Sequence, residues 1–535
     1  MSETVLLGDE AVALGALHAG ISTAYAYPGT PSTEILEYLI RYAEKHHRPV
    51  AQWCTNEKTA YEAALGTSFA GKRSLVAMKH VGLNVAADPF MNSAIVAIHG
   101  GLVLAVADDP GMHSSQNEQD SRYFADFARI LCLEPANQQE AYAMTRDAFD
   151  LSERFQIPVM IRLVTRLAHS RAVVQVGDPR AENPLNKEPR PNSWILLPAN
   201  ARVQWHKLLQ MQDGIKAYGE KSPYNQLILN PGFREYGVIT TGLAKNYYLE
   251  NAPELEVSPS HLHIGTYPFP VKKIRGLAEH VKRIIVLEEG YPFVERFLRG
   301  LLPTPLRILG KESGDVPPEG ELTPDNIRPV LGLPERKARR TPSLQVVNRP
   351  PQLCPGCPHA DTYNAIKSAV AHFPQSMVTA DIGCYTLGAL PPYSAIESTV
   401  NMGASVGMAK GAAEAGFSPV LAVIGDSTFL HSGVTPLMDA VAHNTNMTLI
   451  ILDNETVGMT GGQPTILPTS RLESLIRGLG VSKEHFHVIT AHRRFTDYNS
   501  EIIRREMAYE GLSVIIAVRE CVETAKRHKR EGARK

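Results

Sequence analysis

Short apolar runs alternate with longer helix-like stretches over residues 1–190. The runs that predict strands are 24–27, 74–78, 102–106 and 159–163. The stretches that predict helices are 31–46, 59–70 and 138–155. Alternation of strands and helices indicates a parallel, doubly wound α/β sheet, because parallel strands are joined by crossover helices.

The same alternation returns twice further along the chain, in residues 231–312 and 352–535. The segments between these regions, 191–230 and 313–351, are rich in Pro and charged residues. Such a composition favours a surface arm and a linker over a compact fold. We therefore expect an α/β protein in which two doubly wound outer domains, 1–190 and 352–535, flank a smaller α/β domain.

The charge balance of the chain favours neither nucleic acid nor an anionic membrane as a partner. The 535 residues include 54 Lys and Arg against 55 Asp and Glu, a formal net charge of −1. The N-terminus has no basic segment followed by an apolar core, so we do not expect a signal peptide. No apolar run reaches the roughly 18 residues of a membrane-spanning helix. We expect a soluble, cytoplasmic protein.

Polar residues follow two successive apolar runs of the last domain. The run 419–424 is followed by Asp426, and the run 447–452 is followed by Asn454, 28 residues after Asp426. One crossover joins the two runs, so both side chains are expected at the edge of a parallel sheet where ligands bind. Carboxylate and amide oxygens suit a hard cation such as Mg²⁺. A Gly-Asp turn after a strand is also common in any sheet of this type, and that simpler interpretation stays open.

The arrangement resembles the diphosphate-binding motif of thiamine diphosphate enzymes, in which Gly-Asp-Gly is followed by Asn. Gly425 and Asp426 match this motif, while Ser427 replaces the second Gly. Such an enzyme also needs a carboxylate at the aminopyrimidine ring of the cofactor. Glu57, at the mouth of an expected helix in the first domain, can supply it. A Glu in a first helical turn also complements the helix dipole, and taken alone that explanation suffices.

Six cysteines divide into two isolated residues and one group of four. Cys54 and Cys132 lie in apolar surroundings and are expected as buried structural thiols. In the last domain, two cysteines form a Cys-Pro-Gly-Cys turn and two follow separate apolar runs. These four are Cys354, Cys357, Cys384 and Cys521. Four soft thiolates suit an iron–sulfur cluster or zinc, although structural zinc usually takes two close pairs. A redox-active Cys-x-x-Cys pair with two buried thiols is the remaining alternative.

Nearly the whole chain resembles the alpha subunits of indolepyruvate ferredoxin oxidoreductase, within the 2-oxoacid:ferredoxin oxidoreductases. Several sequence blocks carry this resemblance in one order, which makes it specific. They are AYPGTPSTEI (26–35), NEKTAYEAALG (56–66), MKHVGLNVAADP (78–89), LCPGCPHADTY (353–363), DIGCYTLG (381–388), NMGASVGMAKG (401–411) and GDS…DNETVGMTGGQ (425–463). The resemblance implies that the outer domains are of the thiamine diphosphate type and that the smaller one is like the C-terminal domain of transketolase.

The resemblance also implies how the cofactors are held. Glu57 would contact the pyrimidine ring of thiamine diphosphate. Asp426, Asn454 and the backbone carbonyl of Thr456 would hold Mg²⁺ at the diphosphate. In related enzymes a comparably dispersed cysteine quartet holds one [4Fe–4S] cluster close to the cofactor, which favours that interpretation of the four cysteines here.

The implied substrate is a 2-oxoacid, with an arylpyruvate such as indolepyruvate favoured. Thr30 and the segment Lys79-His80 would face it. Lys79 and His80 could equally be a surface cation and a satisfied polar residue at a strand end. The implied reaction is oxidative decarboxylation with coenzyme A to an acyl-CoA and CO₂, with electrons leaving through the cluster.

One departure from the family concerns the electron acceptor. The family's alpha subunits usually continue into a ferredoxin-like domain with repeated Cys-x-x-Cys runs, and no such run follows Cys521. We therefore expect ferredoxin or another electron-accepting subunit as a partner. A smaller beta subunit is expected too, with a homodimer of alpha chains inside a hetero-oligomer.

Two other functions compete with this one. The first is a non-oxidative thiamine diphosphate decarboxylase or lyase, which the missing ferredoxin-like domain favours and the cysteine quartet opposes. The second is a catalytically silent assembly subunit, which the joint presence of Glu57, Asp426 and Asn454 opposes.

Overall fold

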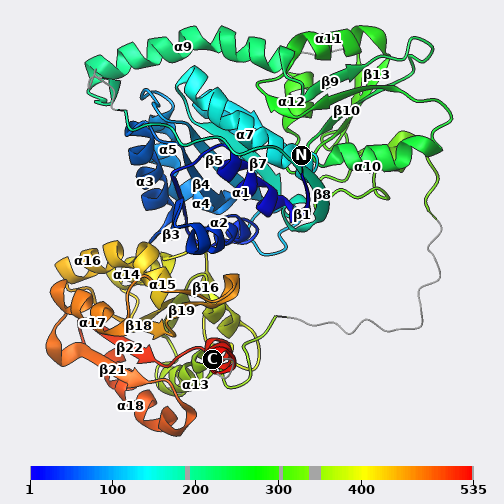
Figure 1. Ribbon diagram of the computed structural model, residues 1–535. Coiled ribbons are helices and arrows are strands. Elements are labelled where there is room, and N and C mark those ends of the chain that lie inside the picture. The colour runs from blue at the N-terminus through cyan, green and yellow to red at the C-terminus, as the bar shows by residue number, and fades with distance from the viewer. Residues whose placement is uncertain (1, 187–192, 301–304, 337–350, 533–535) are drawn as a thin grey trace. The chain divides into compact units, whose positions relative to one another are not determined.

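The computed structural model describes residues 2–186, 193–300, 305–336 and 351–532 (Figure 1). They form two compact units, Met1–Pro342 and Ser343–Lys535. We call these unit 1 and unit 2 and describe each by itself. Within the described ranges, the helices are all too short or too polar to cross a membrane.

The first sheet of unit 1 has seven strands in the order β12-β6-β7-β5-β4-β2-β3. Every neighbouring pair is parallel except β12 with β6. The strands are β2 (Thr23–Ala26), β3 (Val50–Trp53), β4 (Ser74–Lys79), β5 (Leu102–Asp108), β6 (Leu131–Leu133), β7 (Val159–Val164) and β12 (Thr266–Tyr267). The helices are α1 (Gly8–His18), α2 (Thr33–His46), α3 (Glu57–Phe69), α4 (His80–Val85), α5 (Ala87–Ser93), α6 (Arg122–Ala128), α7 (Gln138–Phe155) and α8 (Thr165–His169). A separate antiparallel pair joins β1 (Ser2–Leu7) to β8 (Arg171–Val176).

The second sheet of unit 1 has five strands in the order β14-β13-β10-β11-β9, parallel except for β9. Its strands are β9 (Asn225–Ile228), β10 (Gly237–Thr241), β11 (Ser260–Ile264), β13 (Arg283–Leu287) and β14 (Arg307–Leu309). Its helices are α9 (Pro198–Lys221), α10 (Ala244–Asn251), α11 (Val271–His280) and α12 (Phe293–Arg299). The segment expected as an arm, 191–230, therefore contains a long helix and the edge strand of this sheet. Pro198 stands in the first turn of α9, where its missing N–H costs nothing.

The described part of the expected linker packs against unit 1, which differs from the expectation drawn from composition. Val316, Leu322 and Ile327 are fully buried in the core of unit 1. Arg328 is buried as well and donates to Asn251 Oδ1 at 2.7 Å. A few apolar side chains spaced among the charged ones are enough to dock this segment. Residues 337–350 of the expected linker lie outside the described residues.

Unit 2 is a doubly wound sheet of six parallel strands in the order β16-β15-β17-β18-β22-β21. Its strands are β15 (Met377–Ala380), β16 (Ser398–Thr399), β17 (Val420–Gly425), β18 (Met447–Asp453), β21 (Phe486–Thr490) and β22 (Leu512–Val518), with a small hairpin of β19 (Thr456–Val457) and β20 (Gln463–Pro464). Its helices are α13 (Pro358–Val370), α14 (Ala404–Glu414), α15 (Asp426–Thr428), α16 (Val434–Ala442), α17 (Thr469–Gly478), α18 (Thr496–Met507) and α19 (Val522–Gly532).

Alternate residues of the central strands of unit 2 enter two separate cores. On β17, Leu421 and Val423 belong to one core, while Ala422 and Ile424 belong to the other. Successive side chains of a strand point to opposite faces, so a strand covered by helices on both faces must be apolar throughout. This is why β17 and β18 appear in the sequence as unbroken apolar runs.

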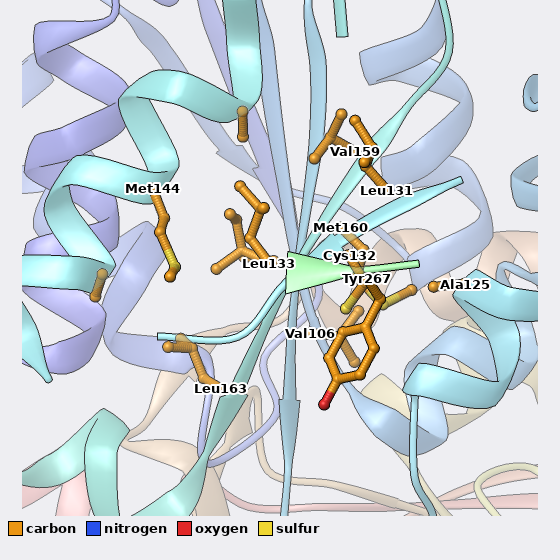
Figure 2. Close-up of a cluster of buried hydrophobic side chains, with 14 of the residues drawn as sticks. Val106, Ala125, Leu131, Cys132, Leu133, Met144, Val159, Met160, Leu163 and Tyr267 are labelled. Carbon is orange, nitrogen blue, oxygen red and sulfur yellow. The ribbon is translucent and has the colours of Figure 1, made fainter. Parts of the chain in front are cut away.

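Part of the core of unit 1 lies where β12 pairs with β6, which in turn pairs with β7 (Figure 2). Cys132 and Met160 lie there with the ring of Tyr267 among fully or nearly fully buried side chains. Burial raises the pKa of the Cys132 thiol, which makes it inert, as expected for a structural cysteine. Cys54 is only half-buried, and its burial raises the pKa of the thiol to about 11.

A buried network of charges crosses the first sheet. The guanidinium of Arg162, on β7, donates to Asp108 at 2.7 Å and to Glu134 at 2.5 Å. The guanidinium of Arg122 lies 3.0 Å from Glu288, just after β13, and so ties the second sheet to the first. Both arginines are fully buried, so each carboxylate here depends on its cation.

We expect Arg162→Met to destabilise unit 1 strongly, because it leaves Asp108 buried without its guanidinium and leaves Glu134 only the more distant Arg122, at 3.8 Å. Removing one partner of a buried ion pair typically costs about 3–5 kcal/mol. The thermal unfolding midpoint measures this loss. Arg171→Met removes an exposed arginine of β8 and is the matched control, expected to stay within about 0.5 kcal/mol of the parent chain. Equal midpoints for the two variants would contradict the role given to the network.

Candidate active site

Two carboxylates end the neighbouring strands β17 and β18. Gly425 pairs with Leu452, so the residues that follow, Asp426 and Asp453, stand side by side. Both are buried, and burial together with the nearby Asp453 carboxylate raises the pKa of Asp426 well above its ordinary value. Asp426 accepts hydrogen bonds from the backbone N–H of Ser427 at 2.8 Å and of Glu455 at 2.9 Å. Asp453 Oδ2 accepts none in the part of the chain that the structure describes.

Such a pair of buried acids fits a divalent cation. Two carboxylates in a low-dielectric site repel each other unless a positive charge or a proton lies between them. Oxygen ligands at the carboxyl ends of parallel strands are the donor set that Mg²⁺ prefers. The structure therefore places two buried carboxylates side by side at the sheet edge expected from the sequence.

The amide of Asn454 is held in a fixed orientation beside these acids. Its nitrogen donates to Nε2 of His359 at 3.0 Å, and its oxygen accepts the backbone N–H of Thr456 at 3.1 Å. Burial lowers the pKa of His359 to about 4, so the imidazole is neutral and can accept this bond. Thr456 lies on β19, and its hydroxyl donates to the carbonyl of Gln463 at 3.1 Å. Asp426, Asn454 and Thr456 thus meet at one edge of the sheet.

Gly425 is required by a close neighbour rather than by the turn. A Cβ at this position would lie 2.6 Å from the ring of Tyr385, which is too close for any side chain. Ser427, in contrast, takes part in the turn through its backbone N–H, which every residue but Pro offers. The replacement of Gly by Ser at 427 therefore leaves the backbone contact to Asp426 intact.

The four cysteines of unit 2 gather at the same edge. Burial, together with the nearby thiols of Cys357, Cys521 and Cys354 and the carboxylate of Asp426, raises the pKa of Cys384 to about 12. The N–H of Cys357 donates to the carbonyl of Cys354 at 3.0 Å, which closes the Cys-Pro-Gly-Cys turn. The N–H of Cys521 donates to the carbonyl of Asn454 at 3.3 Å. The quartet thus adjoins the diphosphate motif.

In unit 1, Glu57 is the first residue of α3 and is buried. Asn56 caps the helix, with its side-chain oxygen accepting the N–H of Thr59 at 2.9 Å. Gly82, on α4, leaves the space that the Glu57 carboxylate fills, because a Cβ there would lie 2.5 Å from Glu57 Oε1. The position of this carboxylate therefore depends on a glycine from a different helix.

Lys79 ends β4 and is buried rather than a surface cation. Its ammonium donates to the carbonyl of Ser114 at 2.7 Å, and the Ser114 hydroxyl donates to the carbonyl of Thr30 at 3.3 Å. Burial lowers the pKa of Lys79 to about 8. The structure therefore brings Thr30 and Lys79 together through Ser114 at the carboxyl edge of the first sheet.

His80 follows Lys79 as the first residue of α4 and is also buried. Its Nε2 donates to the carbonyl of Asn117 at 3.3 Å, so Nδ1 is the ring atom that can accept a proton. Nδ1 has no hydrogen-bond partner among the described residues, and burial lowers the pKa of the ring. His80 stands two residues before Gly82 and hence on the same short helix that faces Glu57.

Sequence reasoning missed Asp453, His359 and Gly82. Asp453 carried a usable signal, because it directly follows an apolar run and precedes Asn454. His359 lies 95 residues from Asn454, and no spacing in the sequence indicates their hydrogen bond. The need for glycine at 82 comes from a contact between two helices, which the sequence does not record.

Comparison with protein families matches a part of each unit. Residues 14–207 match the family described as "Pyruvate flavodoxin/ferredoxin oxidoreductase, thiamine diP-bdg". Residues 381–492 match "Thiamine pyrophosphate enzyme, C-terminal TPP binding domain". The fold and the site define a thiamine-diphosphate-dependent enzyme that oxidatively decarboxylates 2-oxoacids.

Individual relatives give the family within this class. The chain is 38% identical to the indolepyruvate oxidoreductase subunit IorA of Archaeoglobus fulgidus, over 98% of this chain and 88% of that protein. It is 36% identical to the protein of that name from Methanothermobacter thermautotrophicus, over 97% of this chain and 86% of that protein. It is 35% identical to the Pyrococcus abyssi protein of that name, over 97% of this chain and 85% of that protein. The chain belongs to the family of indolepyruvate oxidoreductase alpha subunits.

Among solved structures, the chain is similar to "2-oxoglutarate:ferredoxin oxidoreductase from Magnetococcus marinus with 2-oxoglutarate, coenzyme A and succinyl-CoA bound". The sequence identity is 19% and the TM-score 0.49, over 58% of this chain and 62% of that one.

Proposed function

We propose that this chain converts an aryl 2-oxoacid, such as indolepyruvate, and coenzyme A to an acyl-CoA and CO₂. The same reaction releases one proton and two electrons, and the electrons leave through one [4Fe–4S] cluster. The observation that carries this proposal is the gathering of four thiols beside Asp426. An iron–sulfur cluster accepts electrons singly, so a two-electron oxidation needs such a relay close by. The aryl substrate follows the printed names of the relatives, and coenzyme A follows the family resemblance.

The spacing of the thiols supports a cluster over zinc. Tetrahedral zinc with Zn–S bonds of about 2.3 Å holds its thiolates about 3.8 Å apart. Among the described residues, no three of these cysteines have sulfur atoms within 4.8 Å of one another. A cluster that bridges four sulfurs fits this wider arrangement of Cys354, Cys357, Cys384 and Cys521. Because the pKa of Cys384 is raised, its thiol stays protonated unless a metal ion beside it stabilises the thiolate.

Asp426, Asn454 and the carbonyl of Thr456 are proposed as the residues that would hold Mg²⁺ and so favour binding of an anionic diphosphate. Asp453 lies beside Asp426 and adds negative charge that favours a divalent over a monovalent ion. When bound, thiamine diphosphate supplies the electron sink for the loss of CO₂.

Glu57 is proposed as the carboxylate that contacts the pyrimidine ring of the cofactor, where it accepts and returns a proton. Its burial at the start of α3 and its close fit against Gly82 support this role. A positioned proton-transfer group typically contributes about 10²–10⁴-fold in rate.

Thr30, Lys79 and His80 are proposed to bind the 2-oxoacid. A buried ammonium can pair with the substrate carboxylate with little competition from water. The neutral ring of His80 offers Nδ1 as an acceptor for a substrate proton. The polar atoms of Ser114 keep the Lys79 ammonium in place before the substrate arrives.

The proposed partners are a smaller beta subunit and ferredoxin or another electron-accepting subunit, within an assembly that pairs two of these chains. The relatives' printed names describe subunits, which supports a larger assembly.

Gly82→Ala should lower thiamine-diphosphate-dependent turnover at least tenfold, because the new methyl group displaces the Glu57 carboxylate. Steady-state oxidation of indolepyruvate with saturating cofactor measures the effect. Gly66→Ala is the matched control: Gly66 lies on α3 with Glu57, and a Cβ there has no neighbour within 4 Å. Full activity in the Gly82→Ala variant would remove the support for a role of Glu57 at the cofactor.

The KM for the 2-oxoacid should rise between pH 7 and pH 9, because the pKa of Lys79 is about 8 and only its protonated form pairs with a carboxylate. One pH unit above that pKa, about a tenth of the lysine is charged, so we expect about a tenfold rise in KM. Lys79→Arg stays charged over this range and should give a flat profile. A profile that is flat in the parent enzyme would rule out Lys79 as the carboxylate partner.

The cluster is tested by Cys357→Ser in protein purified without oxygen. We expect the variant to lose iron and acid-labile sulfide, to keep thiamine diphosphate bound and to stop reducing the electron acceptor. Cys54→Ser, a change of an isolated thiol in unit 1, should leave all three unchanged. If the Cys357→Ser variant still made acyl-CoA at the parent rate, the relay would lie elsewhere. An aldehyde product in the parent enzyme would favour the non-oxidative decarboxylase.

A further inference from the structure

Three potential metal ligands meet in unit 1 on helices that carry none of the proposed catalytic side chains. Asp9 lies in the first turn of α1, Glu34 in the first turn of α2 and His169 at the end of α8. One ligand atom from each lies within 4.8 Å of the other two. In the described part of the chain, these are the three side chains that come together in this way.

The Asp9 carboxylate pairs with no cation among the described residues, because the His169 ring pairs with Glu34 instead, and the Glu34 carboxylate raises the pKa of that ring. Asp9 is fully buried, and neither of its carboxylate oxygens has a hydrogen-bond partner among the described residues. Its charged neighbours are Glu34 and Glu10, and burial with the Glu34 carboxylate raises the pKa of Asp9 well above its ordinary value. The exposed guanidinium of Arg41 lies 4.0 Å from the carboxylate of Glu10.

The distance between two of the three ligands matches that around a tetrahedral ion. Nε2 of His169 lies 3.4 Å from Oε2 of Glu34. That oxygen is buried and accepts no hydrogen bond of good geometry from the described residues. Two ligands that are each about 2.1 Å from one tetrahedral metal stand about 3.4 Å apart. The spacing therefore suits atoms that share a metal ion at least as well as atoms that share a proton.

We propose that Asp9, Glu34 and His169 bind one divalent transition-metal ion, for which Zn²⁺ is the natural candidate. A ring nitrogen beside two carboxylates favours zinc over Mg²⁺ or Ca²⁺, which prefer all-oxygen sites. Three protein ligands leave the fourth position to water on the exposed side of His169.

The ion serves as a clamp between three helices. A Cβ at Gly8 would lie 2.2 Å from the carbonyl of Leu167, so α1 and α8 already pack without any gap at this point. Glu34 stands four residues after Thr30, in the helix that follows the Thr30 loop. An ion held by Glu34 and His169 therefore fixes the start of α2 and, with it, the loop that is proposed to meet the substrate.

The test uses the complete enzyme, loaded with thiamine diphosphate, Mg²⁺ and its cluster, so that the cysteines and the diphosphate site are occupied. After dialysis against micromolar ZnCl₂, elemental analysis should find one zinc per chain in the parent enzyme. Asp9→Asn and His169→Gln should each lose that zinc. Glu44→Gln is the control: it removes one carboxylate charge, as Asp9→Asn does, but at an exposed position of α2, and this variant should keep the zinc.

A second measurement distinguishes a zinc ion that links the three helices from a buried Asp9 carboxyl group that binds no metal. Zinc should raise the thermal midpoint of the parent enzyme and of Glu44→Gln but leave that of Asp9→Asn unchanged. Asp9→Asn removes a buried carboxylate that has no cation, so the variant should fold at least as well as the parent without zinc. A parent enzyme that takes up no zinc, or an Asp9→Asn variant that takes up as much as the parent, would overturn the proposal. Asp9 and Glu34 would then share a proton.

Discussion

The hydrogen-bond register between β17 and β18 is the constraint on which the diphosphate edge depends. Because Gly425 pairs with Leu452, the acids that follow each strand meet side by side. A slip of one residue would move every side chain of β18 to the opposite face and mix the two cores of unit 2. The apolar packing on both faces of the sheet thus fixes the distance between Asp426 and Asp453. The positions of the polar groups at this edge are therefore determined by buried hydrophobic side chains elsewhere in the sheet.

Long elements with one consistent pattern could be predicted from the sequence. The helix expected at 138–155 is α7, and the strand expected at 102–106 is β5. The structure extends the first expected helical turn of α3 back to Glu57, since Asn56 supplies the cap. The helix α9 was not predicted, because the Pro-rich sequence before it is typical of irregular structure and the helix itself begins at a proline. The strand β12 has only two residues, too few to show a pattern of alternating hydrophobic positions, and its place in the sheet comes from its pairing with β6.

The candidate site shows a similar division. Asp426, Asn454 and the four cysteines follow apolar runs or form a tight turn, so local sequence places them at a strand end. His359 and Gly82 matter through contacts with Asn454 and Glu57, and these contacts exist only once distant segments have packed. A site that is built from strand ends can therefore be predicted in outline. The side chains that orient its ligands cannot be predicted in this way, because their partners lie far away in the sequence.

The bond from the N–H of Cys521 to the carbonyl of Asn454 joins the cysteine quartet to the diphosphate motif by a single peptide contact. Any shift of Cys521 with the redox state of the proposed cluster would change the hydrogen bond to the neighbouring peptide. Thermodynamic reciprocity then requires that occupancy of the diphosphate site change the reduction potential by the same coupling free energy. The enzyme would hold its cofactor with an affinity that depends on whether the electrons have already left.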